Sequence, residues 1–452
     1  MPELYTKGKE FNIMKKKITS LILILTLALT MTLGGGAGFA AAASQSEITS
    51  AFNQCGDYLY KTVKDPICGS TGGEWVMYGL AEAGHPMSDD YIARYKANVE
   101  KTVKEGYRGV SGQLHDKKYT EYSRVIVAYA ALGLDPTHIA GYNMVEKLAD
   151  FDKVVWQGIN GPIWALRALD AGNYAVPAVS GIKNVTTRQK LINYILNAQL
   201  DDGGWNLYVS DPSDKDFETT KAKLKSDPDI TGMAMTALAP YRSQKKVKTA
   251  LDKAVKCLSA MQNKEGGFTA WGATSSESIS QAICGLTAMG INPNTDSRFR
   301  KNGKSLVDAL LSFYDSKVGG FRHVNKASAG YEPVVDQMAT EQAYYALAAY
   351  KNTVPDKATI SKAVKSSSTS LKVTWKKAPS SSACSGYQVV LASDSGFTKG
   401  VKKVTVSGRS TVSRKITGLS KGRTYYVKVR AYKTVNGVKV YGAYSEAKKV
   451  KL

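Results

Sequence analysis

RQKLINYILNAQLDDGGWN, residues 188–206, holds its apolar side chains at the spacing of one helical face and ends at the pair Gly203-Gly204. A second stretch, DPDITGMAMTALAPY at 227–241, begins at Asp-Pro-Asp and is apolar almost all round. Such a composition predicts a helix that is buried on several sides. Together the two stretches predict an amphipathic outer helix, a glycine turn and a buried inner helix.

The same unit recurs through the first 350 residues of the chain. Glycine turns with an aromatic residue read TGGEW at 71–75, DDGGW at 201–205, KEGGF at 264–268 and KVGGF at 317–321, with degenerate copies at 109–112 and 158–161. Alanine-rich inner helices are predicted near 74–83, 121–133, 160–171, 228–239, 276–289 and 336–350. Outer helices are predicted near 48–64, 89–105, 138–149, 186–200, 245–263 and 303–316. Repeats of this length indicate a helical array.

The charge is unevenly placed along the chain. The formal net charge is +23, of which +18 lies in residues 354–452, +3 in residues 1–43 and +2 in residues 44–353. A chain of 452 residues is long enough for more than one domain. We therefore expect a leader at 1–43, a helical domain at 44–353 and a basic second domain at 354–452.

The N-terminus predicts export. Lys15, Lys16 and Lys17 precede an apolar run at 18–33, and small residues with A-x-A patterns follow up to Ala43. This order is typical of a signal peptide, with Met14 as an alternative start. The apolar run is shorter than the roughly 20 residues that span a bilayer. Cleavage is therefore favoured over a membrane anchor, and we expect a secreted or cell-surface protein.

Five cysteines are too few for a disulfide scaffold. Cys55 and Cys68 flank the first predicted turn and are candidates for a disulfide in an exported chain. Cys257 and Cys284 are interpreted as buried thiols. The sequence has no Cys-x-x-Cys motif and its four histidines are scattered, so it predicts neither a metal site nor a cofactor.

The repeats resemble the prenyltransferase and squalene-cyclase repeat family, whose fold is a six-hairpin α/α toroid. In 199–205 and 262–268 a glutamine precedes a glycine pair and an aromatic residue, as in that family. The resemblance covers about residues 44–350 and implies that six inner helices close into a ring. An open solenoid of the same hairpins is the alternative. Cyclases, prenyltransferase β subunits, cobalamin carriers and complement-type domains all use this toroid, so the fold does not fix the function.

Class II terpenoid cyclases protonate their substrate with the middle carboxylate of a D-x-D-D motif at the start of an inner helix. Asp227, Pro228, Asp229 and Ile230 occupy those places here, so Asp229 matches the general acid and Ile230 replaces the last carboxylate. That replacement removes a group that helps to keep the donor protonated and aimed. The zinc ligands of protein prenyltransferases have no counterpart at any inner-helix terminus, which argues against that activity. A cobalamin carrier is similar in its export and its appended β-domain.

From about residue 354 the pattern changes to alternating strands, at 371–377, 387–393, 402–408, 411–417, 424–432 and 447–452. Trp375 lies in an early strand, and Leu419 precedes Tyr425 by six residues. These features resemble a fibronectin type III sandwich in which Tyr425 is the corner tyrosine. The expected fold class is therefore multidomain, with an all-α six-hairpin α/α toroid followed by an all-β fibronectin type III-like sandwich.

Carboxylates recur at the N-terminal ends of the inner helices: Glu74, Glu121, Asp227, Asp229, Glu277 and, one turn deeper, Glu341. In a closed ring they would face one rim above an aromatic cavity. Candidate residues for its lining are Trp164, Tyr122, Tyr331, Tyr344 and Tyr345. Acids in a first turn also cap helices and complement their dipoles, so capping is the alternative for each. The aromatic residues that follow the glycine pairs are interpreted as turn packing.

We expect a non-catalytic binding protein, secreted or at a bacterial-type cell surface. Its toroid would hold a ligand, hydrophobic or cobalamin-like, or a protein segment, and its basic sandwich would tether it. One alternative is a cyclase-type enzyme with Asp229 as general acid and Trp164 steadying a carbocation. Another is a structural scaffold with a filled ring.

Anionic cell-wall polymers suit the basic domain, with simple solubility as the alternative. Neither nucleic acid nor zinc is expected as a partner. The sequence leaves open whether the polar insert 206–226 forms a lid.

Overall fold

The computed structural model describes residues 43–328, 330–379, 382, 384–435 and 437–452. The expected signal segment lies outside these residues. Within them, no helix combines the length and the apolar character needed to cross a bilayer.

Helices occupy the chain up to Thr353, in two sets. The inner helices are α3 (Trp75–Ala83), α5 (Thr120–Ala131), α7 (Asn160–Ala171), α10 (Pro228–Leu238), α12 (Ser276–Ala288) and α14 (Gln337–Thr353). The outer helices are α2 (Gln45–Thr62), α4 (Asp89–Glu105), α8 (Arg188–Asn197), α11 (Lys245–Met261) and α13 (Leu306–Leu311). Each lies within a few residues of its predicted position, except that α13 is shorter.

The third outer helix, predicted at 138–149, is the exception. A turn with Ala140 and Gly141 both at positive φ occupies its first half, and only a 3₁₀ turn at Val145–Ala149 and the short α6 (Phe151–Val155) follow. Two successive left-handed residues cannot continue a right-handed helix. The prediction of a full helix there was wrong.

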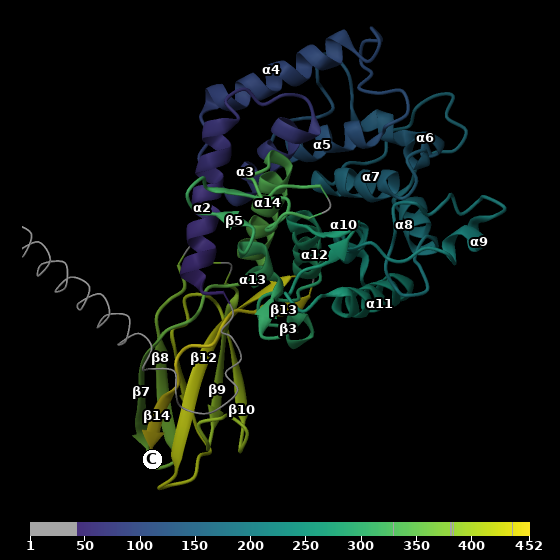
Figure 1. Ribbon diagram of the computed structural model, residues 1–452. Helices are drawn as coiled ribbons and strands as arrows, with labels where there is room; N and C mark the ends of the chain where they lie inside the picture. Colours follow the sequence, from purple (N-terminus) through teal and green to yellow (C-terminus); the bar gives the residue numbers. More distant parts are fainter. Residues whose placement is uncertain (1–42, 329, 380–381, 383, 436) are drawn as a thin grey trace, which may run out of the picture. The chain divides into compact units, whose positions relative to one another are not determined.

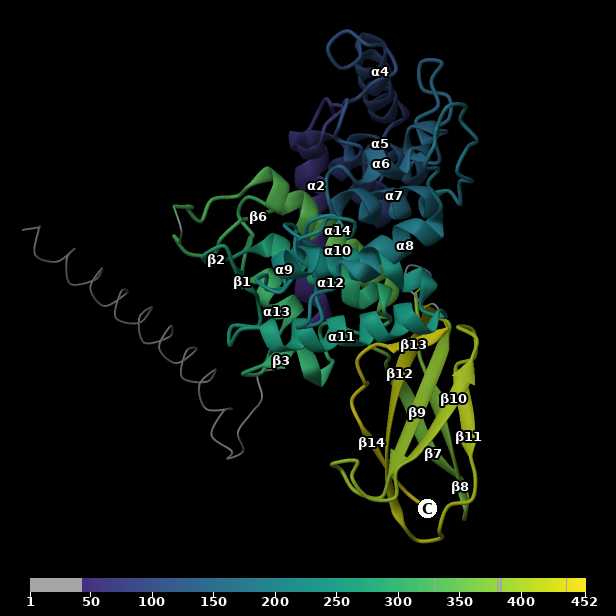
Figure 2. The same cartoon turned by 90° about the vertical axis from the view of Figure 1, so that its right-hand side faces the viewer.

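The inner helices pack side by side in chain order, and α14 returns to pack against α3 (Figure 1). The α10–α12 pair is the tightest contact, because glycines meet there. A Cβ added at Gly232 would lie 2.3 Å from the Gln281 carbonyl oxygen. This distance is too short for any side chain, so the close approach of the two helices requires glycine at position 232. Figure 2 shows α10, α12 and α14 as neighbours from a second direction.

Three of the glycine turns are built alike. Gly203, Gly266 and Gly319 have φ of 97°, 87° and 92°, the left-handed region that glycine enters without strain. The Nε2 of Gln199 donates to the carbonyls of Gly203 and Ala250, and that of Gln262 to the carbonyls of Gly266 and Phe299. The glutamine therefore ties its own turn to the next outer segment. The aromatic residues that follow, Trp205, Phe268 and Phe321, are all fully buried, which confirms their interpretation as turn packing.

Short hairpins and one helix decorate the inter-helix loops: β1 (Thr269–Ala270) with β2 (Ala273–Thr274), β3 (Arg300–Lys301) with β4 (Lys304–Ser305), β5 (Tyr314–Asp315) with β6 (Gly320–Phe321), and α9 (Phe217–Lys221) in the polar insert. The polar insert precedes α10 in the chain, and the β1–β2 hairpin precedes α12. Both segments therefore contribute side chains near the N-terminal ends of these helices.

The C-terminal part is a two-sheet sandwich. One sheet has the order β11 (Ser413–Ile416), β8 (Ser370–Trp375), β7 (Ile360–Ser367). The other has the order β10 (Lys402–Ser407), β9 (Gly386–Ala392), β12 (Thr424–Val435), β13 (Val438–Tyr441), with β14 (Lys448–Lys451) also on β12. All six predicted strands are present, and β7 and β13 are additional. Trp375 is buried in the core, and the Tyr425 hydroxyl accepts a hydrogen bond from the Ser420 amide at 2.9 Å, forming the expected corner.

All five cysteines, each of which the structure describes, are free, which corrects the suggested Cys55–Cys68 disulfide. The Cys55 thiol is buried and donates to the Thr340 carbonyl of α14. Cys68 lies instead near Glu74. Burial raises the pKa of the Cys68 thiol, and the negative charge of Glu74 adds to this rise. The two thiols contact different neighbours, so they do not form a disulfide although they are close in sequence.

Candidate functional site

Asp227 is the N-cap of α10. Its Oδ1 accepts hydrogen bonds from the amides of Asp229 at 2.8 Å and Ile230 at 3.1 Å, so capping is its structural role. Its second oxygen, Oδ2, accepts a hydrogen bond from the Trp271 Nε1 at 3.0 Å. Trp271 stands between β1 and β2, so the cap also fixes that hairpin over the end of the helix.

Asp229, in the first turn of α10, has an environment unlike that of a surface carboxylate. The Ser278 hydroxyl donates to its Oδ2 at 3.2 Å. Its Oδ1 is buried and has no hydrogen-bond partner among the described residues. Burial raises the pKa of Asp229 to about 8, the charges of Asp227 and Glu277 add to the effect, and the Ser278 hydrogen bond opposes it. The folded state therefore favours the protonated form of this carboxyl near pH 7.

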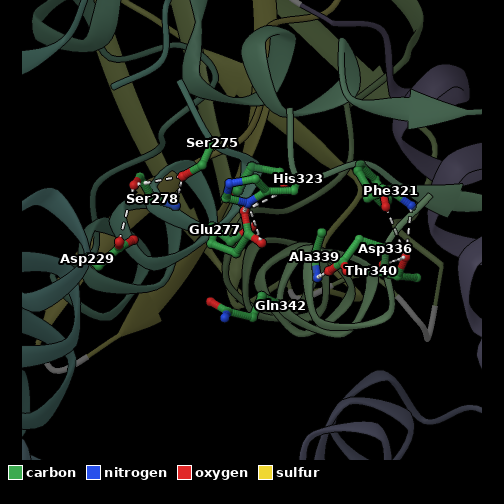
Figure 3. Close-up of polar contacts among 12 residues, drawn as sticks. Asp229, Ser275, Glu277, Ser278, Phe321, His323, Asp336, Ala339, Thr340 and Gln342 are labelled. Atoms are coloured by element: carbon green, nitrogen blue, oxygen red, sulfur yellow. Dashed lines mark hydrogen bonds and ion pairs between the residues drawn. The ribbon is translucent and has the colours of Figure 1, made fainter. Parts of the chain in front are cut away.

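Glu277 of α12 pairs with His323, as Figure 3 shows. The Nδ1 of His323 lies 2.9 Å from each carboxylate oxygen. Burial raises the pKa of Glu277, and the His323 hydrogen bond and charge oppose that rise. The Ser276 amide donates to the His323 carbonyl at 3.1 Å and so holds the histidine loop against the start of α12. Sequence reasoning missed His323 because it lies in a loop, 46 residues from its partner.

Glu74 and Glu121 share one cation. Arg124 of α5 donates through Nε to Glu74 at 3.3 Å and through Nη1 to Glu121 at 3.1 Å. Glu74 is fully buried and also accepts a hydrogen bond from the Gly69 amide at 3.0 Å. Burial raises the pKa of Glu74 to about 7 against the opposing effect of Arg124. These two acids form a closed cluster, which the sequence analysis did not foresee because it overlooked Arg124.

Glu341 connects the two ends of the helical part. Its Oε1 accepts hydrogen bonds from the Gly72 amide and from the Gln337 Nε2, both at 2.8 Å. Gly72 belongs to the first glycine turn, 269 residues away along the chain. Its Oε2 is buried without a partner in the described part of the chain, and burial raises the pKa of Glu341 to about 7. This carboxyl thus helps to join the last unit to the first.

Aromatic side chains from three inner helices form one cluster. The Trp75 ring of α3 lies 4.7 Å from that of Trp164 in α7 and 6.1 Å from that of Tyr345 in α14. The Arg167 guanidinium stands 4.2 Å above the Trp164 ring, a favourable cation–π geometry. The structure thus places two of the candidate lining residues, Trp164 and Tyr345, in one cluster.

Two other candidate lining residues point elsewhere. Tyr344 stacks on Phe52 of the outer helix α2 at 5.2 Å. The Tyr122 hydroxyl donates to the His115 carbonyl at 2.8 Å and so closes its own loop. Neighbouring positions of a helix face different directions, so Tyr344 and Tyr345 lie in different surroundings. The assignment of Tyr122 and Tyr344 to a ligand site stays a prediction.

A cavity of about 430 Å³ opens at the other end of the inner helices. Residues that line it include Tyr78, Glu82, Arg167, Asp170, Thr236 and Pro240. None of the rim carboxylates takes part. In the described residues there is also no group of three or more His, Cys, Asp or Glu side chains arranged to hold a metal ion.

Comparison with known proteins identifies one part of the chain. Residues 357–445 match the family model of the fibronectin type III domain, so the chain carries such a domain. The search of curated proteins found no match.

Solved structures with fibronectin type III domains are similar over about a fifth of the chain. They include the FN1–FN3 domains of chicken CNTN1 (22% identity, 22% of this chain and 32% of that one, TM-score 0.18) and the FN5 domain of Drosophila Lar (27%, 22% and 95%, 0.17). The sixth fibronectin type III domain of human fibronectin type III domain containing protein 3 is 26% identical, with coverage of 21% and 82% and a TM-score of 0.17. The chain spans about a third of the chicken structure.

Proposed function

We propose that this protein is an exported binding protein of bacterial type. In this proposal the helical part is a six-hairpin toroid of the prenyltransferase and squalene-cyclase repeat kind, and it holds a ligand at the rim of Asp229 and Glu277. The fibronectin type III domain tethers the toroid. The return of α14 to α3 and the repeated glutamine–glycine turns support the toroid.

The observation that carries the ligand site is the unpartnered Oδ1 of Asp229. Buried polar atoms in folded proteins nearly always have a hydrogen-bond partner, because leaving one unpaired costs about 1–3 kcal/mol. Here the atom lies beside Ser278 and the Glu277–His323 pair, which supply further donors and acceptors. A ligand that forms a hydrogen bond with this oxygen would remove that cost.

Thermal unfolding of the full chain tests the proposal, with polyprenyl lipids, cobalamins and cell-wall fragments as ligands. A ligand at 100 times its dissociation constant should stabilise the protein by about 2.7 kcal/mol. Asp229→Asn should reduce that gain, whereas Glu100→Gln on the outer helix α4 should leave it unchanged. If no ligand class stabilises the protein, the scaffold role replaces the binding role.

A cyclase-type enzyme is the second candidate, and one observation favours it. A general acid must hold its proton at working pH, and burial keeps the pKa of Asp229 at about 8. Incubation with polyprenyl substrates followed by product analysis tests this role. Cyclised product that disappears in Asp229→Asn would support it, and absence of product with the folded wild type would exclude it for those substrates.

The tethering role rests on the charge of the sandwich. Lys372 of β8 and Lys415 of β11 are directly opposed in the sheet, and both side chains are exposed. Like charges in such a position are destabilising, and an anionic polymer laid across the sheet would relieve the repulsion. Co-sedimentation with purified cell walls should therefore weaken as salt rises. Lys372→Gln with Lys415→Gln should weaken it at low salt, and unchanged binding would contradict the tether.

A further inference from the structure

Three segments far apart in sequence meet beside Asp229. The first is the polar insert, whose Tyr208 ring lies 5.7 Å from the Trp271 ring at 74°. The second is the tip of the β1–β2 hairpin, which carries Trp271. The third is the loop that carries His323 and Tyr331, and its Ser328 hydroxyl donates to the Gly272 carbonyl at 3.4 Å. Together these contacts place three aromatic rings along the same edge of the helical part.

The three rings are exposed. The exposed fractions are 61% for Tyr208, 66% for Trp271 and 52% for Tyr331. Large aromatic side chains normally bury much of their surface, so three in one place mark an interaction surface. We refer to Tyr208, Trp271 and Tyr331 as the aromatic strip.

The strip is held in place by specific contacts. Trp271 has a backbone φ of 53°, a left-handed conformation that residues with a bulky side chain rarely adopt. Its indole is fixed by the hydrogen bond from Nε1 to Asp227, and Tyr331 packs edge-on against the His323 ring at 4.4 Å. Backbone strain that holds an exposed indole in one orientation indicates a preformed contact surface.

Hydrogen-bonding groups lie directly behind the rings. Asp227 supports Trp271, and His323 supports Tyr331 while pairing with Glu277. Asp229 has a buried, unpartnered oxygen beside Ser278. His323 and Glu277 are 29% and 13% exposed, so the surface places flat apolar rings next to partly exposed polar groups.

We propose that the aromatic strip binds a polysaccharide, with pyranose rings stacked on Trp271 and Tyr208 and sugar hydroxyls bonded to the Glu277–His323 pair beside them. A pyranose offers an apolar C–H face and a ring of hydroxyls, which matches these rings and polar groups. A lipid tail would cover the partly exposed Glu277–His323 pair without offering it a hydrogen bond. This inference rests on the proposed binding function and names its ligand class.

The test is titration of the full chain with hexasaccharides of glucose, N-acetylglucosamine and galacturonic acid, followed by tryptophan fluorescence and calorimetry. We expect saturable binding to at least one of them and protection of Trp271 from acrylamide quenching. Trp271→Ala should weaken binding about tenfold or more, because it removes the most exposed ring of the strip, on which a pyranose stacks. Tyr208→Ala provides a second variant if Trp271→Ala alters the fold.

Trp156→Ala is the matched control. Trp156 is 56% exposed and lies at the end of α6, beneath Lys117 at 5.2 Å and outside the aromatic strip. Its removal should change the dissociation constant less than twofold. Equal losses in Trp156→Ala and Trp271→Ala would overturn the proposal, as would oligolysine binding that depends on Trp271.

Failure of this inference can be told apart from failure of the proposed function. If no hexasaccharide binds but a lipid or cobalamin stabilises the protein in a manner that depends on Asp229, the binding function stands and the polysaccharide is wrong. If no ligand of any class binds, both fail.

Discussion

Glu74 and Asp229 occupy nearly matching places, at the N-terminal ends of α3 and α10, yet their surroundings differ. Glu74 is fully buried, and its two oxygens accept hydrogen bonds from Arg124 and the Gly69 amide. Asp229 has one hydrogen-bonded oxygen and one that is buried without a described partner. Burial raises the pKa of both, but only for Glu74 does a cation oppose it. The comparison teaches that one repeated position can hold a fully paired carboxyl in one unit and a partly unpaired one in another.

Loss of Arg124 should have the largest effect on stability. Arg124→Met leaves Glu74 buried without its cation, and breaking a buried pair typically costs 3–5 kcal/mol. We expect about 3 kcal/mol at pH 8 by urea unfolding. The cost should be smaller at pH 5, because Glu74 can then take up a proton.

Arg94→Met is the matched control for Arg124→Met. Arg94 pairs with Asp90 on the exposed face of α4, and such pairs contribute about 0–1 kcal/mol. Equal losses of stability in the two variants would show that the Glu74 cluster is no clamp and would remove the contrast with Asp229.

The second-largest expected effect is the dependence of the free energy of unfolding on pH that Asp229 causes. Its folded pKa of about 8 exceeds the value near 3.9 of an unfolded aspartate. The folded state therefore binds the proton more tightly, and its contribution to stability, complete below about pH 4, is lost as the pH rises towards 8. Asp229→Asn removes this loss, so the variant should gain about 2 kcal/mol on the wild type between pH 5 and pH 6.5.

Urea unfolding at both pH values, for wild type and Asp229→Asn, measures the difference. Glu74 and Glu341 also have raised pKa values, so the wild-type profile alone cannot assign the effect to Asp229. Parallel profiles for the two proteins would mean that Asp229 is ionised and solvated like an ordinary aspartate. The contrast between Glu74 and Asp229 would then fail.

Replacement of His323 should give the smallest effect. The histidine and Glu277 are 29% and 13% exposed, so loss of their contact should cost only about 1 kcal/mol. His323→Gln should also raise the pKa of Glu277, because the histidine opposes the effect of burial. A ¹³C NMR titration of the glutamate carboxyls reports this directly, and an unchanged Glu277 titration would show that the pair has no electrostatic role.

The sequence by itself determined most of the helices and six strands of the sandwich, with their order. Apolar spacing placed the inner and outer helices, and glycine pairs marked the turns, because local backbone preferences and helical period act over a few residues. Strand alternation located the sandwich for the same reason, and the resemblance to fibronectin type III domains supplied the Tyr425 corner. The miss at 138–149 arose where a two-residue left-handed turn interrupts an otherwise helical composition.

Only the tertiary structure decided which carboxyls are paired. Arg124 reaches Glu74 across 50 residues, His323 reaches Glu277 across 46, and the Gly72 amide reaches Glu341 across 269. Likewise, Tyr344 and Tyr345 are neighbours in sequence but face an outer helix and the inner aromatic cluster, respectively. A side chain's protonation and exposure depend on the segments that fold against it, and no local pattern records those segments.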